Sequence, residues 1–145
     1  MKLKALVLAL TVIIFSTTLI AGNNPVDNEA VKSVINQYAQ CLDSKDTSTL
    51  EDLLYTGAKF VCYNSMRDVI TEYDADQFLA GVKKGKLGGW KRDVTIISVD
   101  TNEKTAMVKV EFTDARLKTT EYISIVKVDG AWKIVNCTST LEKNS

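Results

Sequence analysis

The sequence predicts a single α+β domain in which three helices precede a long antiparallel sheet. Before residue 84, three segments carry apolar residues at the three- and four-residue spacing of amphipathic helices. From Trp90 onward, β-branched and aromatic residues dominate four consecutive segments separated by short polar turns. Because the helices come first and the strands follow, we expect the helices to pack on one face of the sheet.

The first 21 residues predict a secretory signal peptide. Lys2 and Lys4 precede the uncharged apolar run 5–21, which ends in small residues. No cysteine lies near this junction, which argues against a lipoprotein. The alternative is an uncleaved anchor, because the run is at the short edge of what spans a bilayer. We therefore expect residues 22–145 to form one exported domain, periplasmic or secreted, without stable membrane association after cleavage.

The first helix is predicted to begin at Asn24 and Pro25 and to end in the polar run 43–46. Asparagine followed by proline is typical of an N-cap and the first helical position. One face of this helix then carries an apolar stripe that would pack on the core: Val31, Val34, Ile35, Tyr38 and Leu42.

Two shorter helices follow, each with a predicted N-terminal cap. Ser48 and Glu51 have the spacing of a capping box, which predicts a helix that continues through Tyr55. Asp74 and Gln77 have the same spacing and predict the third helix, which a glycine-rich segment ends.

The remaining segments are predicted as strands. Residues 58–64 are rich in β-formers, whereas 65–73 is ambiguous between a short strand and an irregular crossing. A meander of four strands follows, over residues 90–100, 105–115, 119–128 and 131–140.

The turn at Asp129 and Gly130 determines which side chains share a face of the last hairpin. Asp-Gly favours a two-residue loop, which sets Ile125 opposite Ile134. The alternative, a three-residue loop with a bulge at Gly130, would shift the pairing by one residue. In the two-residue register Cys137 lies on the outer face. The face toward the helices then carries Glu121, Ile123, Ile125, Trp132, Ile134 and Asn136.

Composition excludes several classes of function. Lysine plus arginine and aspartate plus glutamate each total 18, and the charges are scattered, so nothing favours nucleic-acid binding. The chain has no histidine, which excludes a histidine metal site, a Ser–His triad and an imidazole base. Cys41, Cys62 and Cys137 lack zinc-site spacing. They are interpreted either as three small buried residues or as one disulfide plus a free thiol. We expect no metal and no cofactor.

Two segments, "YAQCLDSKDTSTLEDLLYTGAKFVCY" and "VDGAWKIV", resemble the nuclear transport factor 2-like (NTF2-like) superfamily. That superfamily includes the ketosteroid isomerases, the SnoaL-like cyclases and a lumazine-binding type found in secreted bacterial proteins. The resemblance covers about residues 28–141 and is strongest to the lumazine-binding type. It implies a strongly curved antiparallel sheet that encloses a cone-shaped cavity with three N-terminal helices. It also implies a homodimer formed through the sheet.

The resemblance to the isomerases provides a chemical comparison. It places Tyr38 at the tyrosine that stabilises an oxyanion and Glu121 near the second oxyanion acid. The position of the catalytic base falls at Cys62, where the isomerases have a carboxylate. Loss of a suitable general base lowers the rate by about 10²- to 10⁴-fold, so the isomerase mechanism lacks its central group.

Three functions are therefore compared. The leading hypothesis is a non-catalytic domain that binds a small hydrophobic or aromatic molecule. The second is a cofactor-independent isomerase, dehydratase or cyclase that uses Tyr38, Cys62 and Glu121. The third is a dimeric interaction module whose outer face presents Tyr122, Val126, Val128 and Val135. Each aromatic candidate could instead be a core residue. The candidate ligand-binding residues are Tyr38, Tyr55, Cys62, Trp90, Phe112, Asp114, Glu121, Trp132 and Asn136.

Overall fold

The computed structural model describes residues 25–144 and contains three helices and six strands. The predicted signal peptide and the predicted cap at Asn24 lie outside the described residues. None of the helices within 25–144 is both long and apolar enough to cross a membrane. The elements are α1 (Pro25–Ser44), α2 (Thr47–Leu53), β1 (Leu54–Asn64), β2 (Val69–Asp74), α3 (Ala75–Lys83), β3 (Asp93–Asn102), β4 (Thr105–Thr113), β5 (Leu117–Val128) and β6 (Ala131–Lys143).

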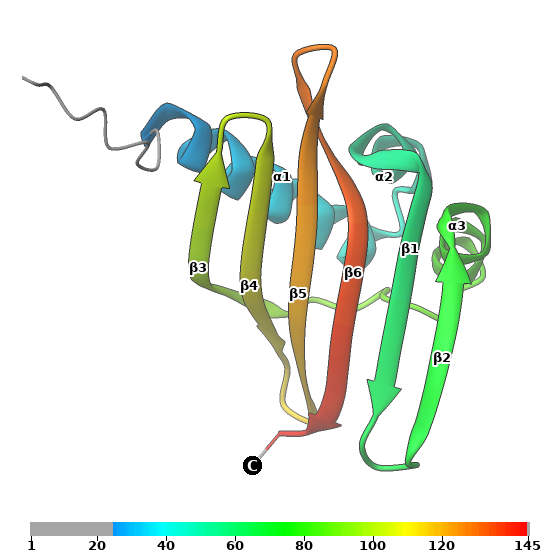
Figure 1. Cartoon of the computed structure of the whole chain (residues 1–145). Helices are drawn as coiled ribbons and strands as arrows, with labels where there is room; N and C mark the ends of the chain where they lie inside the picture. The colour runs from blue at the N-terminus through cyan, green and yellow to red at the C-terminus, as the bar shows by residue number, and fades with distance from the viewer. Residues whose placement is uncertain (1–24, 145) are drawn as a thin grey trace, which may run out of the picture.

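The six strands form one curved sheet in the order β2-β1-β6-β5-β4-β3, as Figure 1 shows. The α+β class with helices packed on a curved sheet is confirmed. One pair differs from the predicted antiparallel arrangement, because β1 runs parallel to β6, with Phe60 beside Cys137. The ambiguous segment 65–73 forms the turn and most of β2, which pairs antiparallel with β1. The sheet is therefore mixed, and its first long strand lies beside its last.

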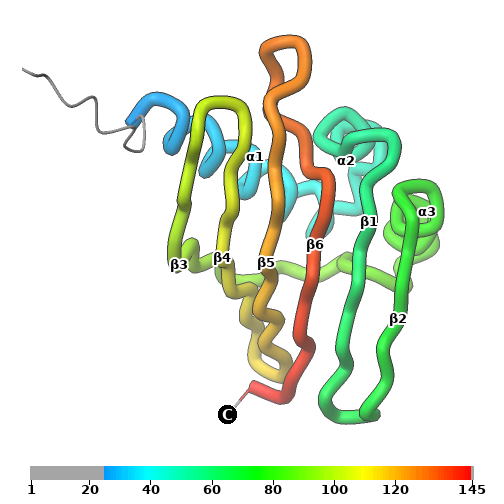
Figure 2. Tube along the Cα trace, in the orientation of Figure 1, coloured from blue at the N-terminus to red at the C-terminus, as the bar shows by residue number. Residues whose placement is uncertain are grey.

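The helices cover one face of this sheet. In Figures 1 and 2, α1 crosses behind the strands from β3 to β6, while α2 and α3 lie behind β1 and β2. The predicted apolar stripe of α1 faces the sheet: Val31, Ile35, Tyr38 and Leu42 are all buried there. This arrangement confirms the predicted packing of the helices on a single face.

Of the two caps predicted for the short helices, the one at α3 is present and the one at α2 is not. The predicted capping box of α3 is present: Gln77 N donates to Asp74 Oδ1 at 2.8 Å, and Asp74 N donates to Gln77 Oε1 at 3.1 Å. The predicted box at Ser48 and Glu51 is wrong. Helix α2 begins two residues earlier, and its cap is Asp46, which accepts from Thr49 N at 3.1 Å. The helix ends at Leu53 because Leu54 already has extended backbone angles and begins β1.

The hairpin of β5 and β6 has the predicted two-residue turn. Asp129 and Gly130 both have positive φ, as a tight hairpin turn of this kind requires, and Ile125 pairs with Ile134. The next pair along is Ser124 with Asn136, so one residue of β6 bulges out of the ladder. Beyond the bulge, each side chain of β6 lies on the face opposite to the one that regular alternation predicts. Asn136 therefore lies on the outer face and Cys137 on the inner face, opposite to the prediction.

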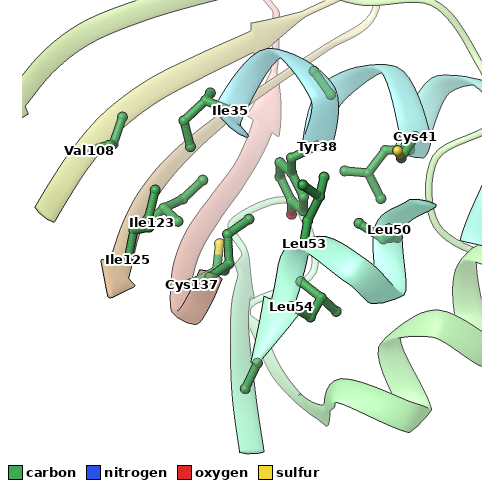
Figure 3. Packing of buried hydrophobic residues seen from close by; sticks show 14 of the residues in the cluster. Ile35, Tyr38, Cys41, Leu50, Leu53, Leu54, Val108, Ile123, Ile125 and Cys137 are labelled. Atoms are coloured by element: carbon green, nitrogen blue, oxygen red, sulfur yellow. The ribbon is translucent and has the colours of Figure 1, made fainter. Parts of the chain in front are cut away.

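Aromatic side chains from four elements pack together in the core. The rings of Phe60 and Phe78 stack with their centroids 3.8 Å apart, and Tyr38 meets the edge of Phe112 at 6.2 Å. Figure 3 shows α1 side chains, among them Ile35 and Tyr38, directed at the buried side chains of the sheet. The helix layer and the inner face of the sheet therefore share one apolar core.

Candidate functional site

A cavity of about 180 Å³ lies on the helix side of the sheet. Strands β1, β2, β5 and β6, helices α1 and α3, and the connection 84–92 contribute to its wall. Most of the lining is apolar and includes Leu42, Phe60, Phe78, Leu87, Leu117 and Leu141. Polar side chains enter it as well: Tyr38, Cys62, Arg92, Thr119, Glu121, Cys137 and Ser139.

Three of the polar side chains hydrogen-bond to one another. Glu121 of β5 is buried, with 6% of its surface exposed. Its carboxyl group accepts a hydrogen bond from the Tyr38 hydroxyl, and Cys137 Sγ donates to Glu121 Oε2 at 3.2 Å. Figure 3 shows Tyr38 of α1 and Cys137 of β6 on opposite sides of the same interior region. The cavity thus has a polar end built from a helix and two strands.

Burial controls the ionisation of this cluster. Loss of solvation raises the pKa of Glu121, while the hydrogen bond from Cys137, the charge of Arg92 and the hydrogen bond from Tyr38 oppose that rise. Burial also raises the pKa of Tyr38 and that of Cys137 well above their ordinary values, and the nearby Glu121 charge adds to both shifts. Tyr38 and Cys137 therefore keep their protons and act as donors, so Cys137 is not a thiolate nucleophile.

Arg92 is a charged residue in the cavity wall that the sequence patterns did not identify. Its Nε donates to Asp43 Oδ1 at 2.9 Å, and its backbone N donates to Asp43 Oδ2 at 3.1 Å. The guanidinium carbon lies 4.8 Å from the centre of the Phe112 ring. In the sequence, Arg92 lies near the start of the predicted strand 90–100, where an arginine is equally typical of a solvent-exposed charge.

Close backbone packing positions this arginine. Gly89 N donates to the Leu42 carbonyl oxygen at 2.8 Å, which ties the connection 84–92 to the end of α1. Gly88 has φ of 65°, and a Cβ there would lie 2.2 Å from the same Leu42 oxygen. Only glycine fits this approach, which brings Arg92 next to Asp43 of α1.

Four of the predicted site residues line the cavity: Tyr38, Cys62, Trp90 and Glu121. Trp90 is 39% exposed and lies where the cavity meets solvent. Its indole hydrogen-bonds to Asp114, whose carboxylate also accepts from Arg116 N at 2.7 Å and from Leu117 N at 3.0 Å. These backbone hydrogen bonds lower the pKa of Asp114. Asp114 thus caps the turn before β5 and steadies Trp90 instead of entering the cavity.

Besides Asp114, four other predicted residues lie outside the cavity lining. Tyr55 is 48% exposed, because β1 begins at Leu54 and Leu54 takes the inward position. Phe112 is fully buried in the core, between Tyr38 and Arg92. Trp132 is also a core residue, covered by the ammonium of Lys127 at 5.3 Å from its ring. The bulge turns Asn136 to the outer face, as described above.

All three cysteines are free thiols in the structure. Cys41 and Cys137 are buried, and Cys62 is partly buried at the cavity wall. The interpretation as small buried residues therefore holds for Cys41 and Cys137 but not for Cys62. Among residues 25–144 no group of three or more His, Cys, Asp or Glu side chains is arranged to hold a metal ion.

Comparison with protein families gives one match. The family described as "Putative lumazine-binding" matches residues 26–138. No curated protein matches the chain.

Solved structures with the same fold come from several bacteria. An NTF2-like protein of unknown function from Silicibacter pomeroyi DSS-3 has a TM-score of 0.70 at 19% identity, covering 79% of this chain and 94% of that one. A second, from Shewanella baltica OS155, has a TM-score of 0.72 at 14% identity, covering 84% and 99%. A cystatin-like fold protein from Burkholderia xenovorans LB400 has a TM-score of 0.68 at 19% identity, covering 85% and 97%. At these identities the likeness concerns the fold alone.

Proposed function

Because the chain belongs to the "Putative lumazine-binding" family of NTF2-like domains, we propose that it is a binding protein for a small hydrophobic or aromatic molecule. The ligand occupies the cavity between α1 and the sheet, and no reaction is catalysed. The observation that carries this proposal is the joining of an apolar cavity to a buried cluster of Tyr38, Glu121 and Cys137. Apolar walls with a few convergent polar groups are typical of small-molecule sites.

The cavity gives the two parts of the ligand different surroundings. The rings of Phe60 and Phe78, with the leucines around them, contact the apolar body. Tyr38 and Glu121 at the polar end orient its hydrogen-bonding atoms. Trp90, which is partly exposed, covers the entrance.

Binding ranks above catalysis because the cavity lacks a dedicated base. Tyr38 and Cys137 retain their protons, since burial raises the pKa of each. Cys62 stands where the related isomerases have a carboxylate, and Glu121 is the only carboxylate in the lining. Glu121 would then have to accept a proton from the substrate and also donate a hydrogen bond to the oxyanion.

One observation favours a second candidate, a cofactor-independent isomerase, dehydratase or cyclase. Tyr38, Cys62 and Glu121 line one cavity, and Tyr38 is hydrogen-bonded to Glu121. In this alternative Tyr38 stabilises developing negative charge while Glu121 or Cys62 transfers the proton. Proton exchange at the α-carbon of a small ketone, followed by NMR in deuterated water, would be catalysed by the protein and abolished in Glu121→Gln. Absence of catalysed exchange counts against this candidate only.

A ligand titration tests the binding proposal. Trp90 lies at the cavity and Trp132 lies in the core, so a Trp132→Phe variant leaves one fluorescent reporter at the entrance. Toluene, indole and lumazine are suitable probes, and we expect at least one to quench or shift the emission saturably. Absence of saturable change with all three, supported by native mass spectrometry, would contradict the proposal.

We also propose that the protein is exported, with residues 1–21 removed. The proposal rests on the basic, apolar and small-residue pattern of that segment. Intact mass spectrometry of the protein recovered from a bacterial periplasm should give the mass of a chain that begins at Gly22. Recovery of the full-length chain from the membrane fraction would instead indicate an uncleaved anchor.

A further inference from the structure

Arg92 is a buried cation whose hydrogen bonds within the protein are incomplete. Its side chain is only 10% exposed. Its Nη2 lies 2.9 Å from Asp43 Oδ1, but that oxygen already accepts from Nε, and Nη2 lacks hydrogen-bond geometry to it. Among residues 25–144, no atom accepts a hydrogen bond from Nη2. A buried donor without an acceptor destabilises the folded protein. A purely apolar ligand would not supply the missing acceptor.

The fold holds this guanidinium in place before any ligand arrives. Asp43 binds both the backbone and the side chain of Arg92, and the Phe112 ring lies against the guanidinium plane. A planar guanidinium fixed by its other contacts is well suited to binding a carboxylate, because its donors are already directed.

The groups around Glu121 make the polar end receptive to an anion. Tyr38 from α1, Cys137 from β6 and Arg92 from the connection before β3 all interact with the Glu121 carboxyl. Cys62 of β1 interacts with Cys137, and Asp43 of α1 pairs with Arg92. Since burial raises the pKa of Glu121, an anion placed beside it raises that pKa further. Glu121 then binds a proton and donates a hydrogen bond to the anion.

The size of the cavity limits the rest of the ligand. Sites for drug-sized ligands usually enclose roughly 300–1,000 Å³, whereas this cavity encloses about 180 Å³. A dry apolar cavity of about 150 Å³ binds benzene. The enclosed part of the ligand is therefore close to one aromatic ring with a short substituent.

We propose that the ligand is a small carboxylic acid with an apolar body of about one ring, bound as its carboxylate to the guanidinium of Arg92, which lines the cavity. This inference rests on the proposed function, because it assigns the head group of the molecule that occupies the same cavity. It names two residues with distinct roles. Arg92 binds the carboxylate, and Glu121 supplies the proton that removes the repulsion between the two acids.

Matched pairs of an acid and its amide test this inference. We would titrate the protein with benzoate and benzamide, 2-naphthoate and 2-naphthamide, and hexanoate and hexanamide. A hydrogen bond to a charged group contributes enough to change affinity by about tenfold or more. We therefore expect at least one acid to bind about tenfold more tightly than its amide. Since the pKa of Glu121 is raised, that preference should shrink as the pH rises through the titration of Glu121, and Glu121→Gln should remove the pH dependence.

Arg92→Lys tests the assigned contact. Lysine keeps the charge and can still pair with Asp43, so the fold should survive the change, but it lacks the planar guanidinium that can bind a carboxylate through two donors. We expect about tenfold weaker binding of the preferred acid and little change for its amide. Arg67→Lys, in the exposed turn between β1 and β2, is the matched control and should change neither.

The two proposals fail in different ways. If no acid binds more tightly than its amide, or if Arg92→Lys leaves acid binding unchanged, the carboxylate inference is overturned and the binding function stands. If none of the acids and amides, and none of toluene, indole and lumazine, binds saturably, the binding function itself is overturned, and the inference with it.

Discussion

At the scale of single residues, Glu121 is the side chain on which the proposed site depends most. Its carboxyl group is buried and accepts hydrogen bonds from a tyrosine and a thiol. Burying a carboxyl group costs free energy that an apolar residue at the same position would not. Its burial follows from the register of the last hairpin, in which Glu121 and Ile123 share the inner face of β5. Glu121 therefore belongs to a site more naturally than to a packed core.

The raised pKa of Glu121 has a measurable consequence for stability. The folded protein holds this proton more tightly than the unfolded chain, whose glutamate has a pKa of about 4.5. The stabilisation is complete below that pH and is lost as the pH rises through the folded value. Each pH unit across that window removes at most about 1.4 kcal/mol. Thermal unfolding of the wild type should therefore lose more stability than Glu121→Gln as the pH rises above 4.5. An unchanged difference between the two proteins would show that the pKa is not raised.

The place of a residue in the site could be predicted only where a local sequence pattern indicates it. Tyr38 lies on the apolar stripe of α1, and Glu121 lies in strict alternation with Ile123, so both could be placed from the sequence. Arg92 could not, because its burial depends on Asp43, which is 49 residues away, and on the close approach at Gly88. Contacts of that kind leave no local pattern.

At the scale of elements, the structure differs from the prediction at the ends of helices and strands and at one bulge in β6. The bulge in β6 exchanges the faces of Asn136 and Cys137. It brings a thiol to Glu121 where an amide was expected. Alternation predicts a face correctly only while the ladder is regular. On β6, the face of each side chain was therefore predictable from the turn to Ile134, but not from Asn136 onward.

The cap of α2 gives a second test at this scale. Asp46 accepts from Thr49 N and also from the Thr49 hydroxyl at 2.7 Å, whereas Ser48 lies inside the helix. Asp46→Ala should destabilise the fold by about 1 kcal/mol, and Ser48→Ala should have little effect. Chemical denaturation of both variants measures the difference. An equal loss in the two would support the capping box at Ser48 instead.

At the scale of the whole molecule, the order of the elements could be predicted because each element has its own periodicity. The parallel pairing of β1 with β6 could not, because it joins segments 77 positions apart in the register. That pairing matters for function, since it sets Phe60 beside Cys137 and Cys62 beside Ser139, all four of which line the cavity.

The outer face of the sheet is the surface through which we predict a homodimer. Tyr122 and Met107 are about half exposed on adjacent strands of that face, and exposed apolar side chains grouped on a sheet favour association. Light scattering of residues 22–145 at high micromolar concentration should give twice the chain mass, and Tyr122→Glu should reduce it. A monomer at that concentration would contradict the prediction.

The central claim is that the interior cavity, and no other surface, holds the ligand. Ser139 and Thr138 are neighbours on β6 whose side chains lie on opposite faces: Ser139 lines the cavity, and Thr138 is exposed. Leucine variants at these two positions carry the same side chain, one directed into the cavity and the other to solvent. Titration of Ser139→Leu and Thr138→Leu with the tightest-binding probe is the most direct test. We expect binding at least about tenfold weaker in Ser139→Leu, where the added side chain fills the cavity, and wild-type affinity in Thr138→Leu. Equal affinity in the two folded variants would contradict that claim.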